Sequence, residues 1–213
     1  MRLPRIFTVA SFVIGLAALV LQFLLTVPLR LGNGDSLVGA VVYYFSFFTI
    51  LTNIALVLIY LSELLGADSL GWFRSPVTRG MMAAAITLVM LFYHVVLAGL
   101  WAPQGWFKAA DVTLHYITPM LYLLWWLFVQ PHRRLRFRDI PPMLLPPLLY
   151  LAYAMIRGTI VGEYPYPILE AHKLGYPQVA LNVLFVLLGL ALLCAVAVGT
   201  DRLVGRRQAA PAA

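Results

Sequence analysis

Four polar residues lie close together in an apolar segment that runs from residue 39 to residue 65. They are Ser46, Thr49, Thr52 and Asn53. On a helix, positions 46, 49 and 53 form one stripe, and position 52 lies beside it. A hydroxyl group in such a stripe can act as a nucleophile if a neighbouring base takes its proton. The alternative is that the hydroxyls bond to carbonyl groups of the preceding turn and only help helices to pack.

A candidate base lies in the segment DVTLHYITP, residues 111–119. Asp111 and His115 are four residues apart, so on a helix the carboxylate can lie beside the imidazole and orient it. Pro119 cannot donate a hydrogen bond to the carbonyl group of His115, and we expect a kink there. Asn53 or the loosened backbone near Pro119 are candidate donors to an oxyanion. These parts suit nucleophilic acyl transfer, with Thr49 and Thr52 both open as nucleophile; a histidine satisfied by a neighbouring helix is the alternative.

The composition indicates a membrane protein. Of 213 residues, 62% are hydrophobic and 11% are charged, and the mean hydropathy is +0.90, whereas soluble domains are about half apolar and a quarter charged. We therefore expect an all-α fold, a polytopic six-transmembrane-helix bundle that forms one domain over residues 1–207, with a disordered tail at 208–213. Six apolar runs approach the roughly 20 residues that span a bilayer. The expected helices are at about 6–29, 39–65, 78–101, 109–130, 142–156 and 178–199.

The basic residues are distributed unequally between the two sides of this expected bundle. The side with both termini has Arg2, Arg5, Arg74, Arg79, Arg133, Arg134, Arg136, Arg138, Arg202, Arg206 and Arg207, and the other side has Arg30, Lys108, Arg157 and Lys173. Because basic connections stay in the cytoplasm, both termini are expected to be cytoplasmic. The net charge of +7 then reflects topology and contact with membrane lipids, and no nucleic acid is expected as a partner.

The remaining polar residues of the membrane segments are expected in the outer half of the bundle, because the helical rise brings them to similar depths. The supporting residues there are Tyr93, His94 and Asn182, and the mouth above them has Arg157, Glu163, Tyr164 and Tyr166. For Arg157 we favour a side chain that extends to the interface. The tyrosines of the YPYP segment are typical of the aromatic belt at a membrane surface.

The connections between the helices limit the possible chemistry. The longest, residues 158–177, is too short to fold as a separate catalytic domain. A reaction must therefore use helix side chains and loop ends, and its substrate is expected to be a lipophilic ester that enters from the bilayer. Neither a metal nor a cofactor is expected, and the single Cys194 excludes a disulfide within the chain.

Three segments carry a resemblance to a known family: FFTILTN at 47–53, DVTLHYITP at 111–119 and RGTIVGEYPYPILE at 157–170. In this order and spacing, the chain resembles the androgen-induced and androgen-dependent membrane hydrolases, in particular their bacterial six-helix relatives. The resemblance implies that Thr49 is the nucleophile and His115 its partner in hydrolysing esters of hydroxy fatty acids. It also implies the bacterial cytoplasmic membrane as the location. Asp111 stands where animal members carry an amide, and Thr52 where they carry Asp or Asn.

Two other functions remain open from the sequence. His94 and His115 are expected at similar depths on neighbouring antiparallel helices, as two axial ligands of haem b must be. A small-molecule transporter is the third possibility, although the sequence lacks two related halves with paired broken helices. A Soret band in the purified protein would support haem binding, and uptake by proteoliposomes without chemical change would support transport.

Overall fold

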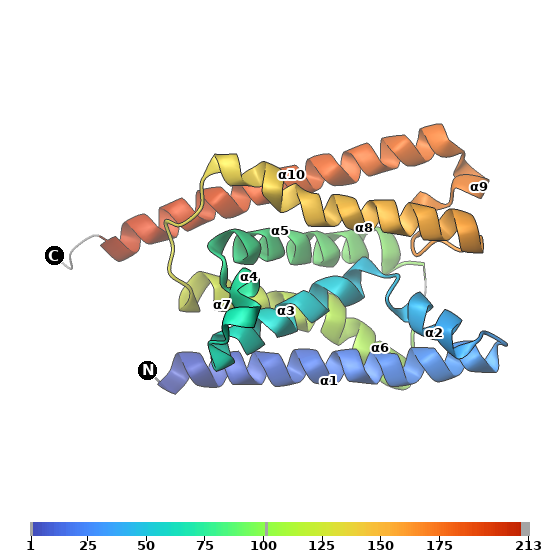
Figure 1. Cartoon of the computed structure of the whole chain (residues 1–213), viewed down its shortest axis with the longest axis horizontal. Helices are drawn as coiled ribbons and strands as arrows, with labels where there is room; N and C mark the ends of the chain where they lie inside the picture. Colours follow the sequence, from blue (N-terminus) through green and yellow to red (C-terminus); the bar gives the residue numbers. More distant parts are fainter. Residues whose placement is uncertain (1, 101, 210–213) are drawn as a thin grey trace.

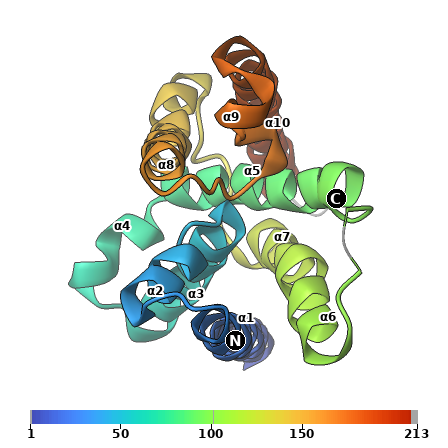
Figure 2. The same ribbon diagram turned by 90° about the vertical axis from the view of Figure 1, so that its right-hand side faces the viewer.

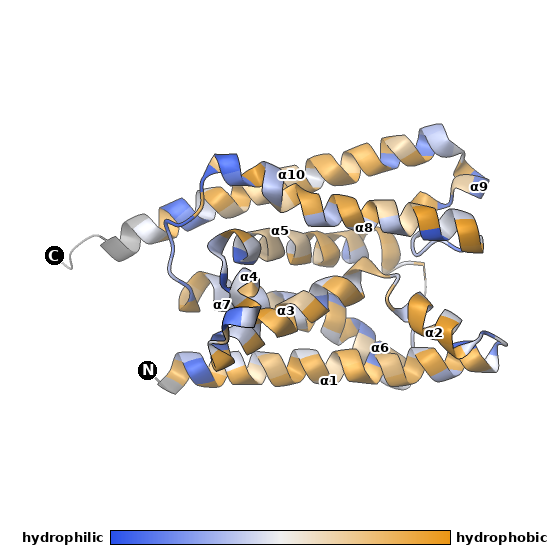
Figure 3. Ribbon diagram, viewed as in Figure 1, coloured by the Kyte–Doolittle hydropathy of each residue, from blue (hydrophilic) through white to orange (hydrophobic). Residues whose placement is uncertain are grey.

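The computed structural model describes residues 2–100 and 102–209, and the long segments in this part of the chain are all helical (Figure 1). Six helical segments are long and apolar enough to cross a membrane. They are Leu3–Gly32, Phe48–Leu65, Pro76–Leu97, Gly105–Val129, Phe137–Val161 and Tyr176–Gly205. The expectation of an all-α, multi-pass membrane protein with six spans is therefore confirmed. Figure 3 shows hydrophobic residues along most of each long helix and hydrophilic residues in many of the connections.

The α-helices are α1 (Arg2–Gly32), α2 (Leu37–Tyr44), α3 (Phe48–Leu65), α4 (Gly71–Arg74), α5 (Pro76–Phe92), α6 (Gly105–Val112), α7 (Thr118–Val129), α8 (Ile140–Val161), α9 (Ala171–Leu174) and α10 (Tyr176–Ala209). Two π-helical segments, η2 (Tyr93–Leu97) and η3 (Thr113–Ile117), extend α5 and join α6 to α7. Short 3-10 turns are η1 (Asp68–Leu70), η4 (Phe137–Asp139) and η5 (Pro167–Leu169).

Helix α5 lies at the centre of the bundle, because it contacts α3, α7, α8 and α10. Figure 2 shows α8, α9 and α10 on one side of it, and α1, α3, α6 and α7 on the other. The largest core cluster surrounds the fully buried Trp125, Tyr122 and Ile86. The indole N–H of Trp125 donates to the Thr8 hydroxyl at 2.8 Å, so α7 is joined to α1 by a polar contact inside the core.

Both ends of the described chain lie at one end of the bundle (Figure 1). A carboxylate of α10 organises that end: Asp201 accepts hydrogen bonds from the backbone N–H groups of Arg134 and Leu135, both at 2.9 Å. The Nδ1 atom of His132 lies 3.1 Å from the same carboxylate. These contacts hold the α7–α8 connection against α10, and α10 continues to Ala209, past the apolar run that was expected to end at residue 199.

Several expected boundaries differ from the structure. The expected single helix 39–65 is two helices, α2 and α3, separated at residues 45–47. The helix expected at 142–156 runs from Ile140 to Val161, where Gly162, at φ 75°, ends it. Residues 208 and 209 of the expected tail belong to α10, because that helix continues to Ala209, and residues 210–213 lie outside the described part. The expected kink near Pro119 is the π-helical turn η3, which ends at Ile117.

Candidate active site

The break between α2 and α3 places Thr49 at the start of a helix. Phe47 is the N-cap of α3 and has extended backbone angles, φ −89° and ψ 130°. The carbonyl group of Ser46, inside the break, accepts a hydrogen bond from the Tyr150 hydroxyl of α8 at 2.9 Å. An α-helix leaves its first N–H groups without partners in the helix. Thr49 therefore lies in the first turn, next to backbone donors that face away from α3.

Of the hydroxyls in the polar stripe, that of Thr49 is directed at the histidine. Its Oγ1 atom lies 3.3 Å from Nε2 of His115. The Ser46 hydroxyl donates to the carbonyl of Val42 at 2.6 Å, one turn back in α2. The Thr52 hydroxyl lies 2.8 Å from the carbonyl of Phe48 and 3.0 Å from that of Thr49. Ser46 and Thr52 thus make the bonds to the preceding turn that were the alternative interpretation of the stripe, and Thr49 does not.

The other ring nitrogen of His115 is held by Asp111. Nδ1 lies 2.9 Å from the main-chain carbonyl of Asp111 and 3.2 Å from its carboxylate Oδ1. A carbonyl oxygen can only accept, so Nδ1 carries a proton, and in the neutral ring Nε2 is the acceptor that faces Thr49. The π-helical turn η3, which contains His115, allows this contact, because it replaces the regular α-helical hydrogen bonds of that turn.

Tyr93 completes the surroundings of the imidazole. Its ring is stacked on that of His115, with a centroid distance of 3.9 Å and an interplanar angle of 18°. Its hydroxyl donates to Oδ2 of Asp111, and only 5% of Asp111 is exposed. Tyr93 begins the π-helical segment η2, and Asp111 lies just before the π-helical segment η3. Two irregular helical turns therefore bring the tyrosine, the carboxylate and the imidazole together.

Asn53 has a positioning role that differs from the one expected. Its Nδ2 atom donates to the carbonyls of Thr49 at 2.8 Å and of Leu114 at 3.2 Å. Its Oδ1 atom accepts from the hydroxyl of Thr118. The expectation that Asn53 could be a donor to an oxyanion is therefore wrong in this structure, because its amide hydrogens are already used. It fastens the first turns of α3 to η3, and so sets the distance between Thr49 and His115.

Two other expected supporting residues lie away from this centre. His94 is exposed, and its Nδ1 atom lies 3.1 Å from the hydroxyl of Tyr116. Asn182 donates to the carbonyl of Ile168 at 2.9 Å and accepts from Gln178 at 2.9 Å. Asn182 therefore ties α10 to η5 of the mouth and does not contact Thr49 or His115.

The mouth is held by a group of charged residues. Glu163 pairs with Arg30 of α1, at 3.0 and 3.1 Å, and its carboxylate lies 3.6 Å from Arg157. Arg157 also donates to the main-chain carbonyl of Glu163 at 2.8 Å, and only 8% of Arg157 is exposed. Arg157 was expected to extend to the membrane interface; instead it is buried, because Glu163 supplies a partner there. Arg30 was expected only as a loop cation, and no local signal in the sequence links it to Glu163.

The two tyrosines of the mouth lie in different environments. Tyr164 covers Gly158, where an added Cβ atom would lie 2.1 Å from its ring, and its hydroxyl lies 3.2 Å from that of Thr159. Tyr166 lies between Phe47 and Phe92, at centroid distances of 6.1 and 6.0 Å. Its hydroxyl lies near the hydroxyl and backbone of Thr49, the backbone of Phe48 and the hydroxyl of Tyr150. Burial raises the pKa of Tyr166, so its phenol stays protonated at neutral pH.

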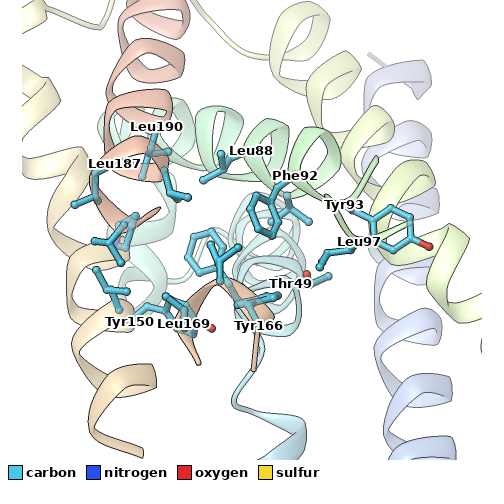
Figure 4. A pocket seen from close by; sticks show the side chains of 17 residues that line it. Thr49, Leu88, Phe92, Tyr93, Leu97, Tyr150, Tyr166, Leu169, Leu187 and Leu190 are labelled. Atoms are coloured by element: carbon cyan, nitrogen blue, oxygen red, sulfur yellow. The ribbon is translucent and has the colours of Figure 1, made fainter. Parts of the chain in front are cut away.

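Two cavities meet at Thr49 and Tyr166. One, which we call the polar cavity, has a volume of about 500 Å³, and its lining includes His115, Asp111 and Arg30. The other, which we call the apolar chamber, is narrower, with a volume of about 90 Å³, and it lies among α5, α8, α10 and the mouth (Figure 4). Thr49, Tyr93, Leu97 and Tyr166 line both. Thr49 thus lines both the polar cavity and the apolar chamber.

Among the described residues, no group of three or more His, Cys, Asp or Glu side chains is arranged to hold a metal ion. Comparisons of the chain with models of known protein families, with curated proteins and with solved structures find no match. The function is therefore inferred from the chemistry of the site, and the site's defining feature is a hydroxyl, an imidazole and a carboxylate in contact at the junction of two cavities.

Proposed function

We propose that this protein is an intramembrane hydrolase that cleaves lipid esters, with Thr49 as nucleophile and His115 as base. The observation that carries the proposal is the short path from the Thr49 hydroxyl through His115 to Asp111, at 3.3 Å and 3.2 Å. This order of groups is that of nucleophile, base and orienting acid in acyl transfer. The resemblance to the androgen-induced and androgen-dependent hydrolases assigns the same two residues and suggests esters of hydroxy fatty acids as substrates.

In the first half-reaction, Oγ1 of Thr49 attacks the carbonyl carbon of the ester, and Nε2 of His115 takes the hydroxyl proton. The negative charge of the tetrahedral intermediate lies on the former carbonyl oxygen. Collapse of the intermediate breaks the bond to the alcohol oxygen, and His115 returns its proton to that oxygen. The products of this half are the free alcohol and an ester between the acyl group and Thr49.

In the second half-reaction, a water molecule from the polar cavity attacks the Thr49 ester, with His115 again as base. The acid is released, and the proton returns through His115 to Oγ1 of Thr49. Asp111 stabilises the imidazolium that forms in each half, because its carboxylate lies beside Nδ1. Tyr93 holds that carboxylate in place through its hydroxyl.

The start of α3 supplies the donors for the oxyanion. The backbone N–H groups of Phe48 and Thr49 lie beside the Tyr166 hydroxyl, and a helix N-terminus favours negative charge. Tyr166, which keeps its proton because burial raises its pKa, is a third donor to the same oxygen. Preorganised donors of this kind are usually the largest single contribution to lowering the barrier of acyl transfer.

Tyr166→Phe is expected to lower kcat by about 100-fold with little change in KM, because removal of one oxyanion donor has an effect of this order. The hydroxyl is lost, but the ring contacts with Phe47 and Phe92 remain. Tyr164→Phe is the matched control, since the Tyr164 hydroxyl contacts Thr159 outside the site. Steady-state kinetics of the two variants test the assignment, and equal rates for both would remove Tyr166 from the mechanism.

We further propose that both termini are cytoplasmic and that the site opens toward the outer half of the membrane, in the cytoplasmic membrane of a bacterium. The unequal distribution of basic residues supports this orientation. Single cysteines introduced at the exposed positions Arg134 and Lys173 should react with a membrane-impermeant reagent from opposite sides. The native Cys194 is buried and should contribute little background, and labelling of both positions from the same side would contradict the orientation.

The proposed function is tested by incubating the purified protein with a panel of lipid esters and measuring the acid released. We expect release from esters with a long or medium acyl chain. A Soret band in the purified protein would support haem binding instead, and uptake by proteoliposomes without chemical change would support transport. The environment of His115 favours hydrolysis over haem binding, because Nε2 of His115 faces the Thr49 hydroxyl and the ring of His94 contacts the Tyr116 hydroxyl instead.

A further inference from the structure

We propose that the apolar chamber is the binding site for the acyl chain of the ester, that the polar cavity receives the alcohol half, and that Leu187 sets the preferred chain length. This inference rests on the proposed hydrolase function and specifies its substrate. Figure 4 shows the chamber from the side, with Thr49 and Tyr166 near one end and Leu187 and Leu190 at the other. A chain bound there has its carbonyl carbon beside the Thr49 hydroxyl.

The described residues that line the chamber are mostly apolar, and none of them is charged. A bound molecule would therefore make mainly hydrocarbon contacts. Two of its hydroxyls are already engaged inside the protein: that of Tyr150 with the carbonyl of Ser46, and that of Tyr93 with Asp111. The hydroxyls of Thr49 and Tyr166 lie where the reaction is proposed to occur. Because a polar ligand would lose hydrogen bonds to water and gain few here, the chemistry favours an alkyl chain.

The polar cavity differs from the chamber because charged and amide side chains line it together with apolar ones. Its lining includes Arg30, Asn33 and Gln22, besides Asp111 and His115. It is also the larger of the two, with a volume of about 500 Å³ compared with about 90 Å³. A polar alcohol half fits this side, and His115 lies there to return the proton to the departing alcohol oxygen. The division of polarity at Thr49 therefore fixes the direction in which the ester binds.

The length of the chamber gives a preferred chain length. Its wall on α10 extends from Val183 to Leu190, and seven helical residues span about 10 Å. An extended alkyl chain advances about 1.3 Å per carbon, as expected for carbon–carbon bonds of about 1.5 Å. The length of this wall sets an upper limit of about eight carbons, and the small volume of the chamber requires the chain to be unbranched.

Leu187 is the residue that tests this assignment, because its neighbour provides a matched control. Leu187 lines the chamber, whereas Leu188 is 57% exposed on the outside of the same helix. Leu187→Trp places an indole in the chamber, and Leu188→Trp makes the same change on the lipid-facing surface. Leu187→Ala enlarges the chamber without adding any obstruction.

The measurement is kcat/KM for the 4-nitrophenyl esters of acetic, hexanoic, octanoic and dodecanoic acids in detergent micelles. We expect the wild type to prefer hexanoate and octanoate to acetate and dodecanoate. Leu187→Trp should lower the value for octanoate by about 30-fold and that for acetate by no more than about threefold, as for a filled binding pocket. Leu188→Trp should match the wild type, and Leu187→Ala should move the optimum to the longer chain.

The chamber assignment is overturned if Leu187→Trp keeps the wild-type preference for the medium chains. It is also overturned if kcat/KM of Leu187→Trp falls equally for acetate and octanoate while Leu187→Ala keeps the wild-type profile. Thr49→Ala, assayed beside these variants, separates the two proposals. A wild type without esterase activity, or an equally active Thr49→Ala, contradicts the hydrolase function itself. Activity that depends on Thr49 but not on acyl length contradicts the chamber assignment alone.

Discussion

Thr49→Ala is expected to abolish ester hydrolysis, with kcat lower by about 10⁴-fold or more, as when the nucleophile of a hydrolase is removed. The reason is that Oγ1 of Thr49 is the hydroxyl of the stripe that faces Nε2 of His115, at 3.3 Å. The side chain is 7% exposed, and alanine keeps its Cβ atom while removing the hydroxyl and the methyl group. The variant should therefore keep its fold while losing its chemistry.

A fluorophosphonate probe gives an independent measurement of the same prediction. It should form a covalent adduct that peptide mapping places on Thr49 in the wild type, and Thr49→Ala should remain unlabelled. Thr52→Ala is the matched control, because the Thr52 hydroxyl faces the carbonyls of Phe48 and Thr49 and not the histidine. Thr52→Ala should keep labelling, and an adduct on Thr52 or Ser46 would refute the assignment of the nucleophile.

Much of this site was predictable from local spacing in the sequence. Asp111 and His115 are four residues apart, so any helical conformation brings them onto one face. Thr49 was one of two threonines in a polar stripe that had to face the interior. What the spacing could not decide was which hydroxyl was directed at the histidine. That depends on how α3 packs against η3, because Thr49 faces Nε2 of His115 there, while the Thr52 hydroxyl lies near the carbonyls of Phe48 and Thr49.

The break between α2 and α3 has no local signal, because residues 45–47 contain neither proline nor glycine. It is compensated from a distant part of the chain: the Tyr150 hydroxyl, 104 positions away, bonds to the carbonyl of Ser46. The same holds for the mouth, where Arg30 and Glu163 are separated by 133 positions. Contacts of this range depend on how the helices pack, and hydropathy along one sequence does not contain that information.

The irregular turn in the fourth span was predictable in part. Pro119 indicated that the hydrogen bonds after His115 would be incomplete, and the structure has its irregularity in the residues just before that proline. A kink was expected, and a π-helical turn is present instead. Two polar side chains form hydrogen bonds at this turn. Asn53 donates to the carbonyl of Leu114, and Thr118 donates to Asn53. The amide expected as a donor to an oxyanion thus bonds to the backbone carbonyls of Thr49 and Leu114 instead.

His115→Ala is expected to remove both turnover and probe labelling, again by about 10⁴-fold or more in kcat. Without the imidazole, the Thr49 hydroxyl loses the acceptor for its proton, and a neutral alcohol is a weak nucleophile at pH 7. The wild-type geometry supports this role, since Nδ1 donates to the Asp111 carbonyl and leaves Nε2 to accept. His94→Ala is the control: His94 is exposed and contacts Tyr116, so its loss should change kcat by no more than about twofold.

Asp111→Asn should have a smaller effect than His115→Ala, and the structure gives the reason. In soluble triads, loss of the acid lowers kcat by about 10⁴-fold because the imidazole takes the wrong tautomer. Here the main-chain carbonyl of residue 111, at 2.9 Å, keeps the proton on Nδ1 whatever the side chain. Only the stabilisation of the imidazolium by the carboxylate is lost, so we expect a decrease in kcat of about 10- to 100-fold, the size of one hydrogen bond to a charged group.

This last prediction is tested by kinetics and probe labelling of the variants His115→Ala, Asp111→Asn and His94→Ala. Slow but detectable labelling of Asp111→Asn, with none for His115→Ala, is the expected pattern. Equal losses in Asp111→Asn and His115→Ala would mean that the carboxylate, and not the carbonyl, fixes the tautomer. Full activity in His115→Ala would contradict the hydrolase mechanism, and an equal loss in His94→Ala would mean that His94 also takes part in the reaction.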